Sequence, residues 1–126
     1  MDPVSLGIAA AALLASKFGE ELAKDAGASA SRAVGRLREL VTARFREEPE
    51  TLTALTTSAE TAQARAVVAE RVGTVAGHDP GFAGEVERLV TAARRDRAAE
   101  VFVAQAFDDA KQVNIRGDNT GTINLG

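Results

Sequence analysis

The chain has 126 residues and a formal net charge of −3; 45% of its residues are hydrophobic and 26% are charged. These values indicate one soluble globular domain with a short terminal extension. The chain has no cysteine, which excludes disulfides, thiolate catalysis and cysteine-ligated zinc and favours a cytoplasmic location. The negative net charge argues against general nucleic-acid binding, because attraction to phosphates needs local positive charge.

Residues 1–26 are predicted to form the first helix, with Asp2 as its N-cap and Pro3 at the first helical position. From Val4 to Ala15 this helix carries no charged residue on any face. One interpretation is a buried central helix whose small residues let its neighbours approach closely. The other is a membrane-active helix that leaves the bundle and enters a bilayer, alone or as an oligomer. The apolar residues assigned to this role are Val4, Leu6, Ile8, Leu13 and Leu14.

Neither a secretory signal nor a simple membrane-spanning helix is predicted at this end of the chain. No basic residue precedes the apolar run, as it would in a signal peptide. The uncharged run is also shorter than the roughly 20 apolar residues that span a bilayer.

A second helix is predicted over residues 32–46, after a break at residues 27–31 in which Ser29 or Ser31 is the N-cap. Its apolar stripe is Val34, Leu37, Val41 and Phe45. The helix is also the most basic stretch of the chain. Its arginines are interpreted as a solvated face paired with nearby carboxylates. As an alternative, three of them are candidate contacts for acidic lipid heads: Arg32, Arg36 and Arg38.

Further helical signals follow Pro49. Residues 50–56 are predicted to form a short helix or turn. Thr57 and Glu60 fit a capping box that would begin a helix ending near Ala76.

The next helix is predicted to start with Asp79 as its N-cap and Pro80 at the first helical position. The buried stripe of that helix is Phe82, Val86, Leu89, Val90 and Ala93. A last helix, either continuous with it or broken at Asp96, completes an all-α bundle of four to five helices over residues 1–110.

The tail, residues 111–126, has a different pattern. Apolar residues fall on alternate positions, which is the period of a β-strand, and the sequence is nearly palindromic about Asn119. Two short strands around a Gly- and Asn-containing turn are predicted, as a hairpin or β-arch. Such a unit becomes stable when copies stack on it. The predicted assembly motif consists of Val113, Asn114, Ile115, Gly117, Asn119, Gly121, Ile123, Asn124 and Leu125.

The sequence contains no convergent set of catalytic groups. The only histidine, His78, stands beside a predicted helix start, and Asp108 and Asp109 lack further ligands at calcium-loop spacing. The glycine-rich residues 117–121 lack the lysine and the following helix of a phosphate-binding loop. We therefore predict a non-enzymatic protein without a metal or cofactor.

Two resemblances support a role in assembly. The tail, with Val113-Asn114-Ile115 followed by Gly117 and Asn119, resembles bacterial amyloid signalling motifs and the related RIP homotypic interaction motif. It departs from the latter in having Asn114 where glutamine is usual and Gly117 one residue late. The opening MDPVSLGIAAAALL resembles the start of Bell and HeLo-like cell-death domains. The layout also resembles that of small actinobacterial helical domains with a GDN-containing tail.

The resemblance implies an effector in bacterial immunity or cell death. A sensor protein with a similar tail would template residues 113–125, the chains would form a homo-oligomer or filament, and the clustered first helix would perturb a membrane. A different class of protein remains open: an adapter or structural protein that oligomerises through the tail. A nucleic-acid binder that uses the arginines of the second helix ranks last.

Overall fold

The computed structural model describes residues 1–15, 28–57 and 61–108, and these form helices and short connections without a strand. The helices are α1 (Pro3–Leu14), α3 (Ala28–Arg44), α4 (Pro49–Thr57), α5 (Ala62–His78) and α6 (Pro80–Arg94), and residues 97–108 are also helical. The all-α prediction is therefore confirmed for these residues. Their six helical segments exceed the predicted four to five because residues 49–57 form a helix and not a turn, and the chain also breaks at residues 95–96.

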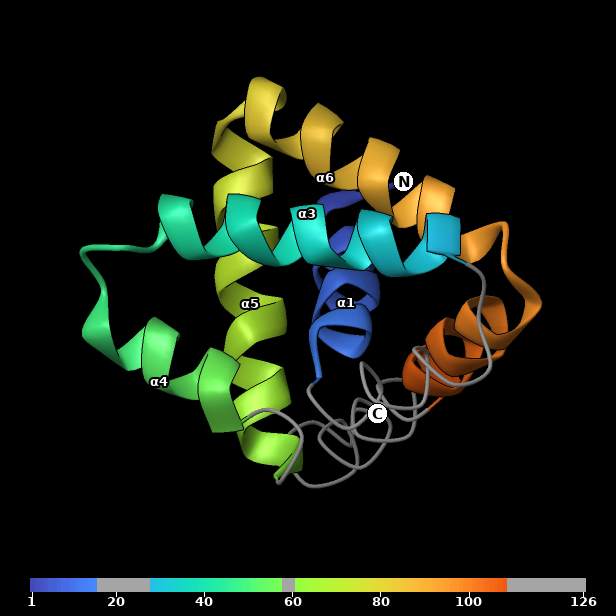
Figure 1. Ribbon diagram of the computed structural model, residues 1–126. Helices are drawn as coiled ribbons and strands as arrows, with labels where there is room; N and C mark the ends of the chain where they lie inside the picture. The colour runs from blue at the N-terminus through green and yellow to red at the C-terminus, as the bar shows by residue number, and fades with distance from the viewer. Residues whose placement is uncertain (16–27, 58–60, 109–126) are drawn as a thin grey trace, which may run out of the picture.

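Helix α1 lies at the centre of the bundle. In Figure 1, α3 crosses in front of α1 and α5, and α6 runs above them; α1 contacts all three of these helices. The side chains of Leu6, Leu13 and Leu14 are at most 1% exposed, and alanines 9–12 are buried around them. A helix that is apolar on every face is stable in water only when every face is covered, which explains its central place.

Two glycines let α1 and α5 cross closely. A Cβ on Gly7 would collide with the backbone carbonyl oxygen of Ala69 and would lie 3.0 Å from the backbone nitrogen of Gly73. A Cβ on Gly73 would lie 3.1 Å from the carbonyl oxygen of Pro3. The α1–α5 contact is the most extensive between any two described helices. These small residues therefore determine how closely α1 lies against α5.

The predicted apolar stripes of the second helix and of α6 are buried, as expected. The rings of Phe45 and Phe82 meet edge to face, with centroids 6.3 Å apart, and this contact joins the residue that follows α3 to the start of α6. The predicted starts of α1 and α6 are confirmed as well. Asp2 accepts a hydrogen bond from the Ser5 amide at 3.1 Å, and Asp79 accepts one from the Phe82 amide at 3.1 Å.

The first helix is shorter than predicted. It ends at Leu14, because Ala15 has an extended backbone (φ −62°, ψ 128°) rather than a helical one. Residues up to Ala15 carry no charge, whereas Lys17 begins a charged stretch of sequence. An uncharged segment can be buried at the centre of the core without the cost of burying charge, and α1 is such a segment. The rest of the predicted helix, residues 16–26, lies outside the described residues.

The second helix starts earlier than predicted, because residues 28–31 are helical instead of forming a break. Ala30 and Ala33 are buried, at 3% and 6% exposure. Their packing against the core outweighs the preference of serine for a cap position. Neither Ser29 nor Ser31 is therefore an N-cap.

The capping box predicted at Thr57 is wrong. Thr57 is the last residue of α4, and the N-cap of α5 is Thr61, whose hydroxyl accepts a hydrogen bond from the Ala64 amide at 3.0 Å. Burial of Ala54 and Leu55 extends α4 through the position where the sequence suggested a helix start. The helix α5 also continues past Gly77 to His78.

Candidate functional site

The described residues contain no group of three or more histidine, aspartate or glutamate side chains that could hold a metal ion. His78 is exposed in the last turn of α5. One open groove is lined by residues of α3 and α6, including Arg36 and Arg88. Another open hollow is lined by α6 residues and Arg95, and Arg88 also lines it. The most unusual element among the described residues is α1, which carries no charge and lies at the centre of the bundle. The contacts at its two ends hold it there.

The five residues predicted for a membrane-active helix do not share one environment. Leu6, Leu13 and Leu14 are buried in the core. Ile8 is half-buried, and Val4 is 66% exposed near the N-terminus. Within the parts of the chain that the structure describes, no helix is both long enough and apolar enough to span a bilayer.

The N-terminal end of α1 is fastened at the surface. The ammonium group of Met1 lies 3.5 Å from a carboxylate oxygen of Glu87 on α6. Hydrogen bonds from Ser5 hold the pKa of the Asp2 carboxyl below its usual value. This carboxylate also lies at the positive end of the helix dipole, where a negative charge is favourable.

The C-terminal end of α1 is fastened inside the bundle. The guanidinium of Arg38 on α3 donates a hydrogen bond through Nη2 to the backbone carbonyl oxygen of Leu14, over 2.7 Å. The last carbonyls of a helix have no partner within that helix. A cation near them also interacts favourably with the negative end of the dipole, so Arg38 acts as a cap supplied by another helix.

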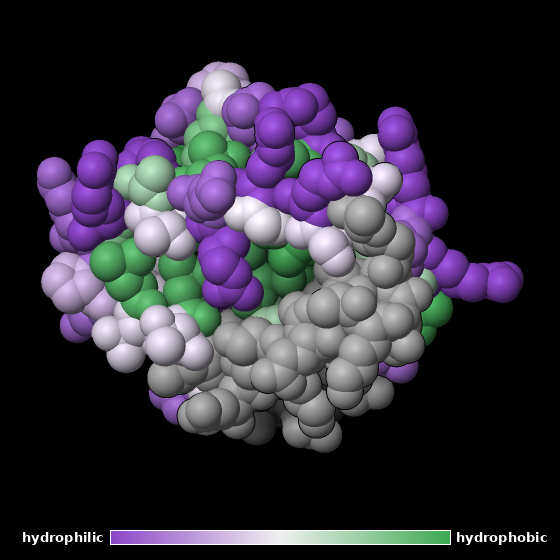
Figure 2. All heavy atoms as spheres, viewed as in Figure 1, coloured by the Kyte–Doolittle hydropathy of each residue, from purple (hydrophilic) through white to green (hydrophobic). Residues whose placement is uncertain are grey.

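The three arginines predicted to contact lipid heads therefore separate into two groups. Arg32 and Arg36 are exposed, and neither has an ion-pair partner among the described residues. Arg38 is half-buried and directed to α1. Figure 2 shows polar side chains gathered over α3 and α6, with apolar atoms visible below α3.

The sequence contained a faint signal for the separate role of Arg38. It directly follows Leu37, a fully buried member of the apolar stripe, and lies four residues after Val34. Its position is thus at the edge of the buried face, where a long side chain can lie over apolar surface and keep its charged end near polar groups.

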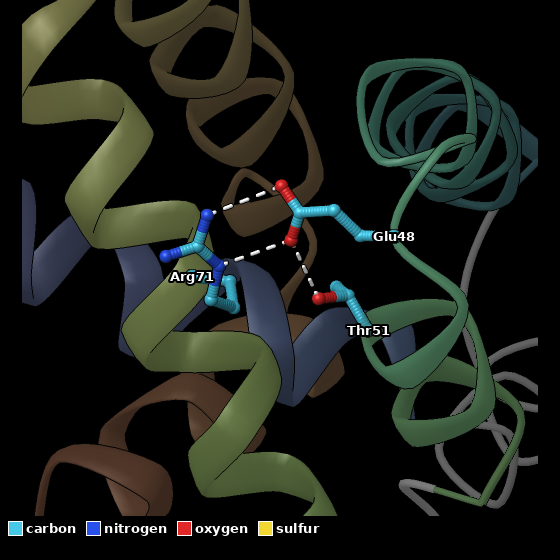
Figure 3. Close-up of polar contacts among 3 residues, drawn as sticks. All are labelled: Glu48, Thr51 and Arg71. Atoms are coloured by element: carbon cyan, nitrogen blue, oxygen red, sulfur yellow. Dashed lines mark hydrogen bonds and ion pairs between the residues drawn. The ribbon is translucent and has the colours of Figure 1, made fainter.

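A second polar contact fixes the connection between α3 and α4 to α5 (Figure 3). Arg71 donates two hydrogen bonds to the carboxylate of Glu48, over 3.2 and 3.1 Å, and Thr51 donates a third over 3.0 Å. These bonds, first that from Arg71, hold the pKa of Glu48 below its usual value. The Arg71 guanidinium also lies 5.9 Å from the centre of the Phe45 ring.

An equivalent pair lies at the C-terminal end of α6. Arg94 donates to both carboxylate oxygens of Glu100, over 2.6 and 3.2 Å, and lies 5.7 Å from the Phe107 ring centre. The bond from Arg94 lowers the pKa of Glu100. The first pair fastens the α3–α4 connection to α5, and the second joins the end of α6 to the helical segment that follows it. Both carboxylates therefore have a structural role in the bundle.

The predicted assembly motif, from Val113 to Leu125, lies outside the described residues. No protein family, curated protein or solved structure was found to match the chain.

Proposed function

We propose that the protein is a non-enzymatic effector whose C-terminal tail assembles copies of the chain and whose α1, stored inside the bundle, then acts on a membrane. In this proposal a partner with a similar tail templates residues 113–125. Clustering brings many bundles together at high local concentration. The exposed Arg32 and Arg36 face the acidic lipid heads.

The observation that carries the proposal is the character of α1. It is uncharged, buried on nearly every face, and placed at the centre of the bundle. At 12 residues it is about 18 Å long, close to the roughly 15 Å depth of one hydrocarbon leaflet. We therefore propose that α1 enters one leaflet and does not cross the bilayer by itself.

The apolar surface that α1 buries in the core sets the free energy that is needed to release this helix. Three fully buried leucines contribute about 1.5–3 kcal/mol each and the buried alanines less, so α1 contributes on the order of 10 kcal/mol as an upper bound. The whole domain is expected to have a stability of about 5–15 kcal/mol. An isolated chain should thus keep α1 in the core. Only another apolar environment, such as the interior of a bilayer, can offset the free energy that is lost when α1 leaves.

The same burial favours a second candidate, an adapter in which the bundle never opens. The close crossing at Gly7 and Gly73 fits a permanent core pair. Deletion of residues 1–16 would not distinguish the two candidates, because it removes the centre of the core. Loss of a cellular effect would then report unfolding and not the loss of a membrane-active helix.

The discriminating experiment uses the full chain and one variant in the tail. Purified protein is mixed with dye-filled vesicles that contain anionic lipid, and filament formation and dye release are followed together. The effector proposal predicts filaments and leakage from the natural chain, and neither from Ile115→Asp, which puts a charge among the alternating apolar residues on which copies of the tail would stack. Filaments without leakage would favour the adapter, and absence of both would refute the role of the tail.

A further inference from the structure

Within residues 1–15, α1 and its N-terminal cap make two polar contacts with the other described helices. One is the Met1–Glu87 ion pair at the surface, and the other is the hydrogen bond from Arg38 to Leu14. All remaining attachment is apolar packing, which has no direction. Among the described contacts, directional polar bonds to other helices therefore hold α1 only at its two ends.

The C-terminal end depends on Arg38 more than the N-terminal end depends on Glu87. The Met1–Glu87 contact is 3.5 Å long and Glu87 is exposed, so solvent can replace it. At the other end, α1 has no basic residue in its last turn, and the amide of Ala15 reaches the Ala12 carbonyl only at 3.4 Å. The carbonyl of Leu14 has a short, charge-assisted bond to Arg38 instead.

We propose that Arg38 is a latch: its hydrogen bond to Leu14 holds the C-terminal turn of α1 in the bundle and sets the threshold at which α1 is released. This inference rests on the proposed function for its biological meaning. The contact itself is independent of the tail and of any membrane. Loss of the bond leaves a carbonyl at the end of a buried helix without its partner, and the last turn of α1 then opens more often than the rest of the core.

The test compares Arg38→Met with Arg36→Met by amide hydrogen exchange, measured by NMR on the full chain. Methionine keeps most of the apolar stem and removes every donor. Arg36 lies on the same helix, is exposed, and makes no polar contact with α1, so it is the matched control. A charge-assisted bond of the usual strength predicts about 10- to 100-fold faster exchange at Leu13, Leu14 and Ala15 in Arg38→Met.

The position of the effect separates a latch from a general stabilising contact. Exchange at Val86 and Val90, in the buried stripe of α6, should change less than about threefold, because local opening does not need global unfolding. Arg38→Lys, which keeps one donor group, should restore most of the protection at Leu14. It also keeps the experiment informative if Arg38→Met does not fold.

Three results would overturn the proposal. These are exchange at Leu14 within twofold of the natural chain, equal acceleration in α1 and α6, and leakage from Arg38→Met no faster than from a natural chain that does leak. The expected result in vesicles is leakage about tenfold faster for Arg38→Met than for the natural chain. Arg36 is a proposed lipid-head contact, so Arg36→Met is the control for hydrogen exchange only, and its leakage should be slower than that of the natural chain. Local acceleration at Leu14 with no leakage from any form would keep the contact as a structural latch and would refute the membrane role.

Discussion

Replacing Gly7 with alanine should destabilise the protein, although alanine is the better helix former. In an ordinary helix interior this substitution stabilises by about 1 kcal/mol. Here the added Cβ would collide with the Ala69 carbonyl oxygen and would lie 3.0 Å from the Gly73 nitrogen. Both atoms belong to backbone, so no side-chain rotation can relieve the contact, and α1 and α5 must move apart.

The expected loss of stability depends on the core packing that is disturbed when α1 and α5 move apart. Overpacking in a core costs about 1–3 kcal/mol and more where backbone has to shift, so the cost should exceed the gain in helix preference. We expect a net loss of about 1–3 kcal/mol for Gly7→Ala. The matched control is Gly35→Ala on α3, where an added Cβ meets nothing within 4 Å. It should stabilise by about 0.5–1 kcal/mol.

Urea unfolding followed by far-ultraviolet circular dichroism measures both variants. The chain has no tryptophan or tyrosine, so helix content is a better signal than fluorescence. A loss of 2 kcal/mol corresponds to a fall in the unfolding midpoint of about 1 M for a chain of this size. A Gly7→Ala variant at least as stable as the natural chain would refute the close crossing of α1 and α5.

Three further substitutions test other contacts. The bonds from Arg71 and Thr51 hold the pKa of Glu48 below its ordinary value of about 4.5, so this group stabilises the fold above that pH and its contribution is lost as the pH falls. Urea midpoints should therefore fall less between pH 7 and pH 3 in Glu48→Gln than in the natural chain, and identical slopes would contradict the role of Glu48. Phe45→Ala should cost about 3–5 kcal/mol in the same assay, because it empties the ring site between α3 and α6; a loss below about 1 kcal/mol would contradict it. Asp79→Ala removes the N-cap of α6 and should cost about 1 kcal/mol, so an unchanged midpoint would show that the cap is dispensable.

The buried faces of the bundle could be predicted from the sequence because periodicity and burial are directly linked. Val34, Leu37, Val41 and Phe45 recur at helical spacing and are all buried. The starts at Asp2 and Asp79 were also predictable, since each is an aspartate followed directly by proline. Local chemistry and tertiary packing favour the same structure at these positions.

Where the sequence offered two possible helix starts, tertiary contacts selected one of them. Thr57 and Thr61 are both acceptable N-caps, and only the packing of α4 selects Thr61. The end of α1 at Leu14 was not predictable locally, because neither proline nor glycine stands between Ala9 and Ala15 to mark it. Arg38 had only a faint local signal, its position at the edge of the buried stripe, since its hydrogen bond depends on the place where another helix ends.

The central claim, that α1 leaves the bundle after assembly, is tested most directly by fastening α1 to α5. The chain has no cysteine, and a Cβ at position 73 would lie 3.8 Å from Cα of Val4, which brings the two backbones within the separation that a disulfide spans. Because that Cβ would also lie 3.1 Å from the Pro3 carbonyl oxygen, mass spectrometry must first show that the bond between Val4→Cys and Gly73→Cys forms, and the reduced form must keep the natural urea midpoint. The measurement is dye release from anionic vesicles by the oxidised and reduced forms of this one protein. The account predicts that both forms assemble and that only the reduced form causes leakage. Equal leakage from the oxidised form would contradict the release of α1.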